Sequence, residues 1–573
     1  MMIDILCKND GRKRRVKAGS PLLDLAQKEY PETADPKTGK CFQVLAALVD
    51  HKLKELSFNV FFPHEVTFIG YNHPDGRRTY IRSLSFLLQH AVRDVFPGKV
   101  LVIDHSLPSG LYCELREGRA GGPAFKPDAE GLERLRARMR EMVEADLPFT
   151  TEKIPSEDAE ALFEEQGQRY KAELRRSLGR YFCRVYYLDG QVDTFHGPLV
   201  PSTGYLKVFG LMPFHKGFCL QPPANSDPSK VTPRRPQSKL SATFKEYSAW
   251  CHTTGIGGIG TLNKTLMDGE AIHLINLCEA RQEREFARVA DLIYAERNRV
   301  KIVFLAGPSS SGKTSSALRL AQQLRVLGME PKVIELDNYF VSRDRTPVDE
   351  DGEFDFEALE AMDLELLGNH LNTLLAGGQV ELPRYDFKQG RPFFEGNFMQ
   401  LEENDILLME GIHALDPAMV PSVDQSRIFR LYASALTSLN VDENNNISTT
   451  DNRLLRRMVR DYSDRGINPE ATILRWPSVR RGENKYIFPF QENADAQFNS
   501  ALLYELPLLK YYAEPLLRRI HPSSPAYTEA VRLLKFLDYI VALTPGEIAA
   551  VPPTSILREF IGGQTLKDCK SRK

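Results

Sequence analysis

The stretch FLAGPSSSGKTSSALRL, from Phe304 to Leu320, fits the phosphate-binding pattern G-x-x-x-x-G-K-[ST]. The preceding KIVFLAG is a short apolar run rich in β-formers. The following SSALRLAQQLRVLG has the 3.6-residue apolar spacing of a helix that ends at Gly328. Because strand, glycine loop and helix follow in the order that phosphate binding requires, the stretch predicts a nucleotide site rather than a chance glycine-serine turn.

The expected cradle consists of backbone N–H groups, because glycines let the loop wrap round a phosphate and the helix N-terminus points at it. We expect Lys313 to reach the β- and γ-phosphates and Thr314 to reach a Mg²⁺ ion. The predicted cofactors are therefore ATP and Mg²⁺. The predicted nucleotide contacts come from Gly307, Ser309, Ser310, Ser311, Gly312, Lys313, Thr314 and Ser315.

Length and composition bound the remaining possibilities. A chain of 573 residues exceeds one hydrophobic core and suggests about three or four domains. The formal net charge of −2 excludes a protein-wide basic field, so any RNA contact would be local. The eight cysteines include no C-x-x-C pair, which argues against a zinc ribbon. The first residues lack the apolar core of a signal sequence, and no apolar run approaches about 18 residues, so we expect a cytoplasmic protein without membrane contact.

The patterns divide the chain into five stretches. Residues 1–70 read as a small α+β unit, and residues 71–225 as a second unit with a polar helical stretch at 128–178. A linker and a long connecting helix occupy residues 226–297, the P-loop domain residues 298–548, and a tail residues 549–573. In the P-loop domain the runs IVFLA, KVIEL, DILLM, RIFRLYA and DYIVALT predict a parallel sheet wrapped by helices. The expected fold class is multidomain, α+β and α/β.

Two carboxylates follow predicted strands of that sheet. Asp337, in LDNYF, lies at the strand end where open α/β sheets bind ligands, and it could accept a proton from a hydroxyl. A turn or cap is the alternative role for an Asp-Asn pair. Glu410 ends the run DILLME, where a carboxylate could hold Mg²⁺ together with Thr314, or simply cap the strand.

Arginines and aromatic residues complete the candidate set. The segment DNRLLRRMVRDYSDRG repeats arginine at helical spacing, at Arg453, Arg456 or Arg457, Arg460 and then Arg465. Phosphoryl transfer needs cations round the migrating group, although a charged helix can also be a solvated face. Tyr385 and Phe387, in LPRYDFKQGRPFF, could stack on a planar base or belong to the core.

The ordered blocks GPSSSGKT, LDNYF, PRYDF, EGI and RLLRRMVRDYSDRG resemble the uridine kinase and phosphoribulokinase group of P-loop kinases, over roughly residues 298–545. The resemblance implies a uridine-type nucleoside kinase, which phosphorylates a hydroxyl on a uridine-like nucleoside or a related small molecule. It assigns the general base to Asp337 and a metal role to Glu410. It also implies that Arg456, Arg460 and Arg465 close over the phosphates, beside Lys313 of the P-loop. As candidates for binding the acceptor we name Asp355, Tyr385 and Phe387.

Two departures from that family concern specificity. The histidine with which uridine-cytidine kinases read the pyrimidine falls at Gly390, and a second arginine of the family falls at Ile467. Kinase chemistry therefore carries over better than uridine specificity.

The first 230 residues resemble the amino-terminal region of threonyl-tRNA synthetase, a TGS domain followed by an editing-type domain. The matching runs include LLQHAVRDVFPGKVLVIDHSLPSGLYCEL and QVDTFHGPLVP. The four places of the family's histidine and cysteine metal set hold Arg82, Phe86, Phe195 and Leu199, so we expect no zinc there. His90 and His196 remain nearby. The region is expected to serve binding, packing or regulation, with an RNA or tRNA contact as one use.

An alternative function stays open at this point, an RNA-associated, ATP-dependent switch with little small-molecule kinase activity. A GTPase switch is disfavoured because the chain has no N-K-x-D guanine motif, and an aminoacyl-tRNA deacylase fails on the missing ligands. The sequence identifies neither the phosphate acceptor nor the partner of the N-terminal half. A homo-oligomer remains an alternative to a monomer.

Overall fold

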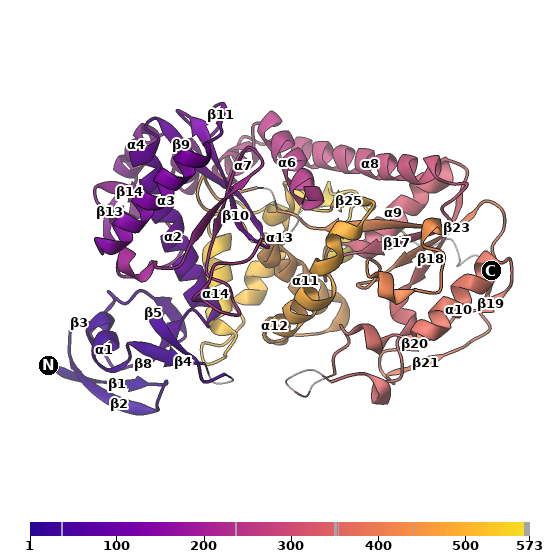
Figure 1. Cartoon of the computed structure of the whole chain (residues 1–573), viewed down its shortest axis with the longest axis horizontal. Coiled ribbons are helices and arrows are strands. Elements are labelled where there is room, and N and C mark those ends of the chain that lie inside the picture. Colours follow the sequence, from indigo (N-terminus) through magenta and orange to yellow (C-terminus); the bar gives the residue numbers. More distant parts are fainter. Residues whose placement is uncertain (36–37, 235–237, 349–351, 353, 438, 567–573) are drawn as a thin grey trace.

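The computed structural model describes residues 1–573 except 36–37, 235–237, 349–351, 353, 438 and 567–573. In Figure 1 the chain runs from a small N-terminal unit through a second α+β unit and a long connecting helix to a helix-wrapped sheet. The last helices return to lie between the two halves. Within the described residues, no helix combines the length and apolar character needed to cross a membrane.

The first unit is the expected small α+β fold. Its sheet has the order β2-β1-β8-β5-β4, with β6 on β5, and β1 runs parallel to β8. Ile5, Val66 and Phe68 lie in its core with the apolar face of α1. The elements are β1 (Met2–Cys7), β2 (Arg12–Lys17), β3 (Ser20–Pro21), α1 (Leu22–Glu29), β4 (Glu32–Ala34), β5 (Cys41–Val49), β6 (Lys52–Lys54), β7 (Asn59–Val60) and β8 (His64–Gly70).

The second unit starts with the amphipathic helix α2 and adds two antiparallel sheets. The larger has the order β11-β10-β16-β15 with β9 on β10, and the smaller is β12-β13-β14. The elements are α2 (Pro74–Val95), β9 (Lys99–Leu107), β10 (Gly110–Glu117), β11 (Ala124–Phe125), α3 (Ala129–Glu144), β12 (Thr150–Pro155), α4 (Ser156–Glu165), α5 (Arg169–Leu178), β13 (Phe182–Leu188), β14 (Gln191–Asp193), β15 (Gly210–Phe214) and β16 (Gly217–Gln221).

The prediction of one polar helical stretch over residues 128–178 was wrong in part. Strand β12 interrupts it and pairs with β13, so the stretch contains three helices and a strand. The segment TTEKIP has two β-branched threonines and ends in a proline, which favours an extended conformation over a helix. The surrounding charge run concealed this break.

Three helices connect the halves. They are α6 (Ser238–Thr253), α7 (Ile259–Met267) and the expected long helix α8 (Ala271–Ala295), which packs against α9 (Lys313–Val326) of the P-loop domain. Phe286 of α8 stacks on Phe498, with ring centroids 4.5 Å apart. The connecting region is therefore built into the core of the P-loop domain.

The predicted parallel sheet is present, with the order β18-β23-β17-β24-β25. One expected strand was wrong. Residues 538–544, the run DYIVALT, form no strand, and Ile540 and Leu543 are instead buried among helices. The fifth strand is the shorter AQFN, because a brief apolar run does not distinguish strand from helix-packing loop. The strands are β17 (Ile302–Ala306), β18 (Glu330–Glu335), β23 (Asp405–Glu410), β24 (Ile428–Ser434) and β25 (Ala496–Asn499).

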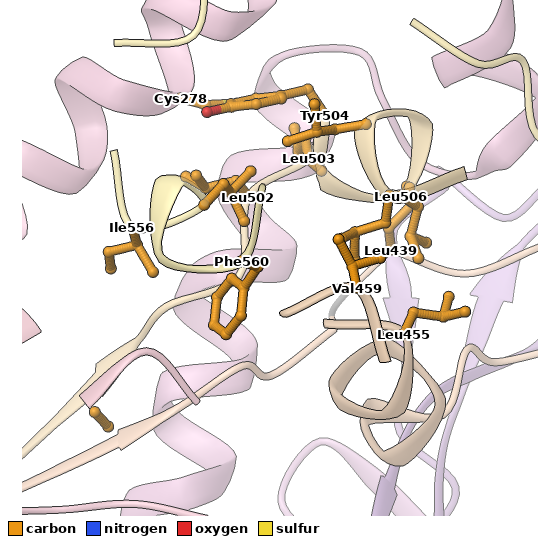
Figure 2. Close-up of a cluster of buried hydrophobic side chains, with 14 of the residues drawn as sticks. Cys278, Leu439, Leu455, Val459, Leu502, Leu503, Tyr504, Leu506, Ile556 and Phe560 are labelled. Atoms are coloured by element: carbon orange, nitrogen blue, oxygen red, sulfur yellow. The ribbon is translucent and has the colours of Figure 1, made fainter. Parts of the chain in front are cut away.

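The remaining elements flank this sheet. Beside the helix α10 (Leu364–Leu375) lie two small hairpins, built from β19 (Val380–Glu381), β20 (Arg384–Asp386), β21 (Arg391–Phe393) and β22 (Phe398–Met399). The C-terminal helices are α11 (Thr449–Arg465), α12 (Pro469–Tyr486), α13 (Glu505–Leu517), α14 (Tyr527–Leu537), α15 (Pro545–Ala549) and α16 (Arg558–Ile561). Figure 2 shows that Ile556 and Phe560, near the end of the chain, join Leu455 and Val459 of α11 in one buried cluster.

Candidate nucleotide and phosphoryl-transfer site

The P-loop connects β17 to α9 as the sequence predicts. Ser310 and Gly312 have positive φ angles of 58° and 81°, which curl the backbone. The loop also approaches β24 closely, because a Cβ on Gly307 would lie 2.1 Å from the Ala433 carbonyl oxygen. Lys313 opens α9, and its Nζ reaches back to donate to the Gly307 carbonyl at 3.0 Å. The P-loop backbone and Lys313 thus contact each other at the start of α9.

The two predicted metal residues lie side by side. Thr314 Oγ1 donates a hydrogen bond to Glu410 Oε1 at 2.6 Å. Glu410 ends β23, the strand next to β17, and burial raises its pKa to about 7 against the opposing effects of Lys313 and Thr314. Within the described residues, no group of three or more His, Cys, Asp or Glu side chains could hold a metal alone. Two protein oxygens fit Mg²⁺, which usually keeps waters and phosphate oxygens as its other ligands.

Asp337 lies at the same edge of the sheet. It follows β18 in a short 3₁₀ turn, Leu336–Tyr339. Although the residue has exposed surface, its carboxyl lies among protein atoms, and this desolvation raises its pKa. Lys313 and Arg465 act in the opposite sense. The carboxyl ends of three neighbouring strands therefore bring Asp337, Lys313 and Glu410 into one electrostatic cluster.

Helix α11 holds its arginines in two different environments. Arg453 and Arg456 are fully buried, where Arg453 pairs with Glu483 of α12 and Arg456 pairs with Glu505 of α13. Both also donate to the backbone beside the P-loop, Arg453 to the Ser309 carbonyl at 3.0 Å and Arg456 to the Ser500 carbonyl at 3.0 Å. Arg456, assigned from the sequence to catalysis, is placed as a buried brace of the loop.

The other arginines of α11 lie nearer the open side. Arg457 Nη1 donates to Ser309 Oγ at 2.9 Å, so its guanidinium touches the P-loop itself. Arg460 lies 3.5 Å from Glu559, and Arg465 is half-exposed and 3.3 Å from Asp461. Ile467, in the family's second arginine place, only donates its N–H to the Asp461 carbonyl at 2.9 Å.

The C-terminal segment covers the first turn of α9, an arrangement that the sequence analysis missed. Glu559 accepts hydrogen bonds from the Ser315 N–H at 3.2 Å and from its hydroxyl at 2.7 Å. Gln564 also donates to Ser315 Oγ, at 2.6 Å. A Cβ on Gly312 would lie 2.6 Å from Ile556 Cγ2. The sequence predicts only a tail after residue 548, because α16 is a single turn without strong periodicity.

Two further carboxylates at this edge were also missed. Glu483 accepts a hydrogen bond from the Ser309 N–H at 3.1 Å. Glu357 faces Glu483, Arg457 and Lys313, and burial raises its pKa to about 7. Neither residue belongs to a recognisable motif, so only the folded arrangement identifies them.

The predicted acceptor residues are less closely grouped. Tyr385 is buried against Phe340 and Phe387, with ring centroids 5.7 Å and 5.1 Å away, whereas Phe387 is exposed. Asp355 accepts a hydrogen bond from the Tyr486 hydroxyl at 3.2 Å.

Gly390 marks the place where the family's base-reading histidine falls. Its φ is +69°, and a Cβ there would lie 2.8 Å from Arg343 Nε. Arg343 therefore occupies the space beside Gly390, and a histidine would be strained and crowded at that position.

In the second unit, the four places expected to lack metal ligands do converge. The Phe86 and Phe195 rings lie 5.4 Å apart, and Leu199 is buried beside them. Arg82 donates to the Pro198 carbonyl at 2.7 Å. Burial and the Arg82 charge lower the pKa of His196 to about 3. Absence of bound zinc stays a prediction, which elemental analysis of the purified protein would contradict by finding one zinc per chain.

Comparisons with known proteins agree with this division. The family described as Phosphoribulokinase / Uridine kinase matches residues 302–503, and this match indicates P-loop kinase activity without naming an acceptor. The threonine–tRNA ligases of Syntrophotalea carbinolica and Polynucleobacter necessarius are 31% and 32% identical over 202 and 204 residues, which are 33% and 35% of this chain. The chain covers 30% of the length of each ligase.

One solved structure, described as a possible uridine kinase from Bacillus stearothermophilus, is 20% identical and aligns with 39% of this chain and all of its own, at a TM-score of 0.26. Residues 302–503 therefore match the Phosphoribulokinase / Uridine kinase family, and the N-terminal region is similar to threonine–tRNA ligases.

Proposed function

We propose that the protein transfers the γ-phosphoryl group of ATP to a hydroxyl of a nucleoside or related small molecule. One observation carries this proposal: Asp337, Lys313 and the Thr314–Glu410 pair lie together at the carboxyl edge of the parallel sheet. That edge is where open α/β sheets bind ligands. A cation, a metal-binding pair and a carboxylate base are the parts that phosphoryl transfer requires.

The P-loop amides and Lys313 would hold the nucleotide phosphates, and Thr314 and Glu410 would hold Mg²⁺. When bound, the metal ion supplies positive charge that neutralises the phosphate oxygens. Asp337 would accept the proton of the acceptor hydroxyl. The hydroxyl oxygen would form the new bond to the γ-phosphorus while the bond between that phosphorus and the ADP oxygen breaks. Desolvation raises the pKa of this carboxyl, and the neighbouring Lys313 opposes that rise because it favours the ionised form that can accept a proton.

The arginines divide this work. Arg457 and Arg460 line the P-loop side of α11 and would stabilise the charge on the migrating group, with the half-exposed Arg465 closing later. Arg453 and Arg456 would hold the loop and helix in register. Asp355, Tyr385 and Phe387 would border the acceptor. Because Arg343 fills the space beside Gly390, we propose that a uridine-like acceptor would be read by a contact other than the family's histidine.

The N-terminal region suggests the second candidate, an RNA-associated ATP-dependent switch. Its similarity to threonine–tRNA ligases favours an RNA contact, and the loop before α11 inserts into it, since Ile103 donates its N–H to the Glu443 carbonyl at 2.8 Å. A panel of nucleosides and sugar phosphates, incubated with the protein, ATP and Mg²⁺, separates the two. ADP release that depends on an acceptor supports the kinase, whereas ADP release stimulated by RNA alone supports the switch.

A further inference from the structure

The second unit contains a pocket of about 440 Å³ that no residue of the P-loop lines. It lies against the small sheet β12-β13-β14 and the end of α5. Part of its wall, Tyr539, comes from the residues that follow α14. Figure 1 shows α14, in yellow, beside the indigo and purple N-terminal elements. The pocket is therefore shared by the N-terminal region and the C-terminal helices.

The lining of this pocket is cationic. Lys153, Arg175, Arg180 and Arg184 face one carboxylate in the lining, Glu152. Arg180 and Arg184 have carboxylate partners outside it, in Asp538 and Glu55. Within the part of the chain that the structure describes, Arg175 has no carboxylate within ion-pair distance. The pocket thus carries an excess of positive charge, with its least compensated member on α5.

Arg175 is also buried, with 7% of its surface exposed. Its Nε has no hydrogen-bond partner, and its Nη2 makes one long contact of 3.5 Å to Thr194 Oγ1. Against the effect of burial, electrostatic interactions with Tyr539 and Asp442 raise the pKa of Arg175, so the guanidinium is charged but has no carboxylate of the described residues in direct contact. Burying a charge without a partner is costly, and buried polar atoms in native proteins are nearly always hydrogen-bonded. A guanidinium held in this way fits an anion with at least two acceptor oxygens.

Aromatic side chains form the other part of the wall. The Arg175 guanidinium lies 5.6 Å from the Tyr539 ring centroid, and Lys153 Nζ lies 4.5 Å from that of Phe182. Phe195 also lines the pocket. The volume lies in the range of roughly 300–1,000 Å³ that is usual for small-molecule sites, and it far exceeds the size of a lone phosphate ion. Aromatic faces bind planar rings by stacking.

We propose that this pocket is a second, non-catalytic site for a nucleotide, whose phosphate pairs with Arg175 and Arg180 and whose base lies against Phe182 and Tyr539. The ligand is a free nucleoside monophosphate or the terminal nucleotide of an RNA strand, and both present the same phosphate and ring. The site touches both halves of the chain. Four residues before Arg175, the Lys171 N–H donates to the Glu443 carboxylate at 3.2 Å, and Glu443 precedes the arginine helix α11.

Equilibrium dialysis of the full chain with radiolabelled AMP, and separately with a short single-stranded RNA, tests the site. The assay is run with the wild-type protein and with Lys313→Ala, which removes the P-loop lysine but leaves this pocket intact. Arg175→Gln and Arg180→Gln should each weaken binding at least about tenfold, the effect of losing a charge-assisted hydrogen bond. Arg176→Gln is the matched control, because Arg176 is the next residue and pairs instead with Glu160 and Glu164.

The two probes identify the source of the ligand. If AMP binding persists in Lys313→Ala and is lost in Arg175→Gln, the ligand of the pocket is a free nucleotide. If only the RNA shows this pattern, the ligand is the terminal nucleotide of an RNA strand. Arg180 is half-exposed at the rim of the pocket, so Arg180→Gln still tests ligand binding if Arg175→Gln folds poorly. The proposal is overturned if neither probe binds, or if binding is unchanged in both pocket variants. A failed kinase assay would not affect this result, because the site shares no residue with the P-loop.

Discussion

The two halves of this chain use buried arginines in opposite ways. In the P-loop domain, Arg453 and Arg456 are fully buried and each holds a carboxylate. In the N-terminal region, Arg175 is almost as buried and holds none among the described residues. A buried arginine that is paired with a carboxylate stabilises the fold, whereas one without a carboxylate in contact can still bind an anion.

The same comparison extends to groups that can perform chemistry. The P-loop domain keeps a base, a lysine and a metal-binding pair at one edge of its sheet. The N-terminal region has Phe86, Phe195 and Leu199 at places where the resemblance to threonyl-tRNA synthetase predicts metal ligands, and its pocket is lined mainly by cationic and aromatic side chains. We infer that catalysis belongs to one half and recognition to the other.

The largest effect should come from removing the base. Asp337→Asn keeps the shape of the side chain and abolishes its basicity, so phosphoryl transfer should fall roughly 10²- to 10⁴-fold while ATP binding persists. Single-turnover kinetics measure the rate of phosphoryl transfer, and a titration with ATP measures ATP binding. Asp344→Asn, at an exposed position of the loop that follows, is the control. Transfer near the wild-type rate would move the base to another carboxylate, with Asp355 and Asp386 next to be tested.

The next largest effects should distinguish two arginines of α11, one that stabilises the fold and one that acts in catalysis. Arg456→Ala leaves Glu505 buried without a partner, which should cost about 3–5 kcal/mol of unfolding free energy. Arg460→Ala, on the same helix face, should fold normally and lose on the order of 10²-fold in kcat. Chemical denaturation and steady-state kinetics of both variants test this division. A stable Arg456→Ala with a large kcat loss would return Arg456 to direct catalysis.

The junction between the halves should be sensitive to pH. Glu443 is buried there with Lys171 and Asp442, and burial raises its pKa to about 8 from 4.5. A carboxyl with a raised pKa in the folded state binds more protons when folded, so stability should fall as pH rises from about 4.5 to about 8. Glu443→Gln, which cannot ionise, should flatten that part of the profile. An identical slope in the variant would show that Glu443 does not titrate in this range.

The smallest effect concerns Glu559. Its carboxylate accepts the Ser315 N–H at the start of α9, where the nucleotide phosphates would otherwise bind. Glu559→Gln removes a negative charge from that place, so ATP should bind about tenfold more tightly, by the usual strength of a charged hydrogen bond. Titration with a non-hydrolysable ATP analogue measures the change, with Glu547→Gln on α15 as the control. Weaker binding in Glu559→Gln would make Glu559 part of the nucleotide site.

Much of this arrangement could be predicted because its signals are local. The P-loop needs a strand, glycines and a helix within about 25 residues, and Thr314 and Glu410 each end or start a strongly patterned element. The pairing of Thr314 with Glu410 follows from the parallel sheet, whose carboxyl ends meet at one edge.

The features that could not be predicted from the sequence depend on contacts between residues that are far apart in the chain. Glu559 contacts Ser315 across 244 residues of sequence, and no periodicity links them. The run DYIVALT is apolar enough for a strand, but helix packing buries it instead. Arg456 and Arg460 follow the same helical spacing, so the sequence does not distinguish them. In the fold Arg456 pairs with the buried Glu505, whereas Arg460 lies near Glu559 beside the start of α9.

The central claim is that the P-loop domain transfers phosphate to a small-molecule hydroxyl. The most direct measurement follows the label of [γ-³²P]ATP in the presence of Mg²⁺ and each member of a panel of nucleosides and sugar phosphates, with Lys313→Ala as the inactive control. We predict that the label appears on one acceptor class, in amounts equal to the ADP formed, and that Lys313→Ala forms no such product. Label released only as inorganic phosphate, with or without RNA, would contradict the account and favour the nucleotide switch.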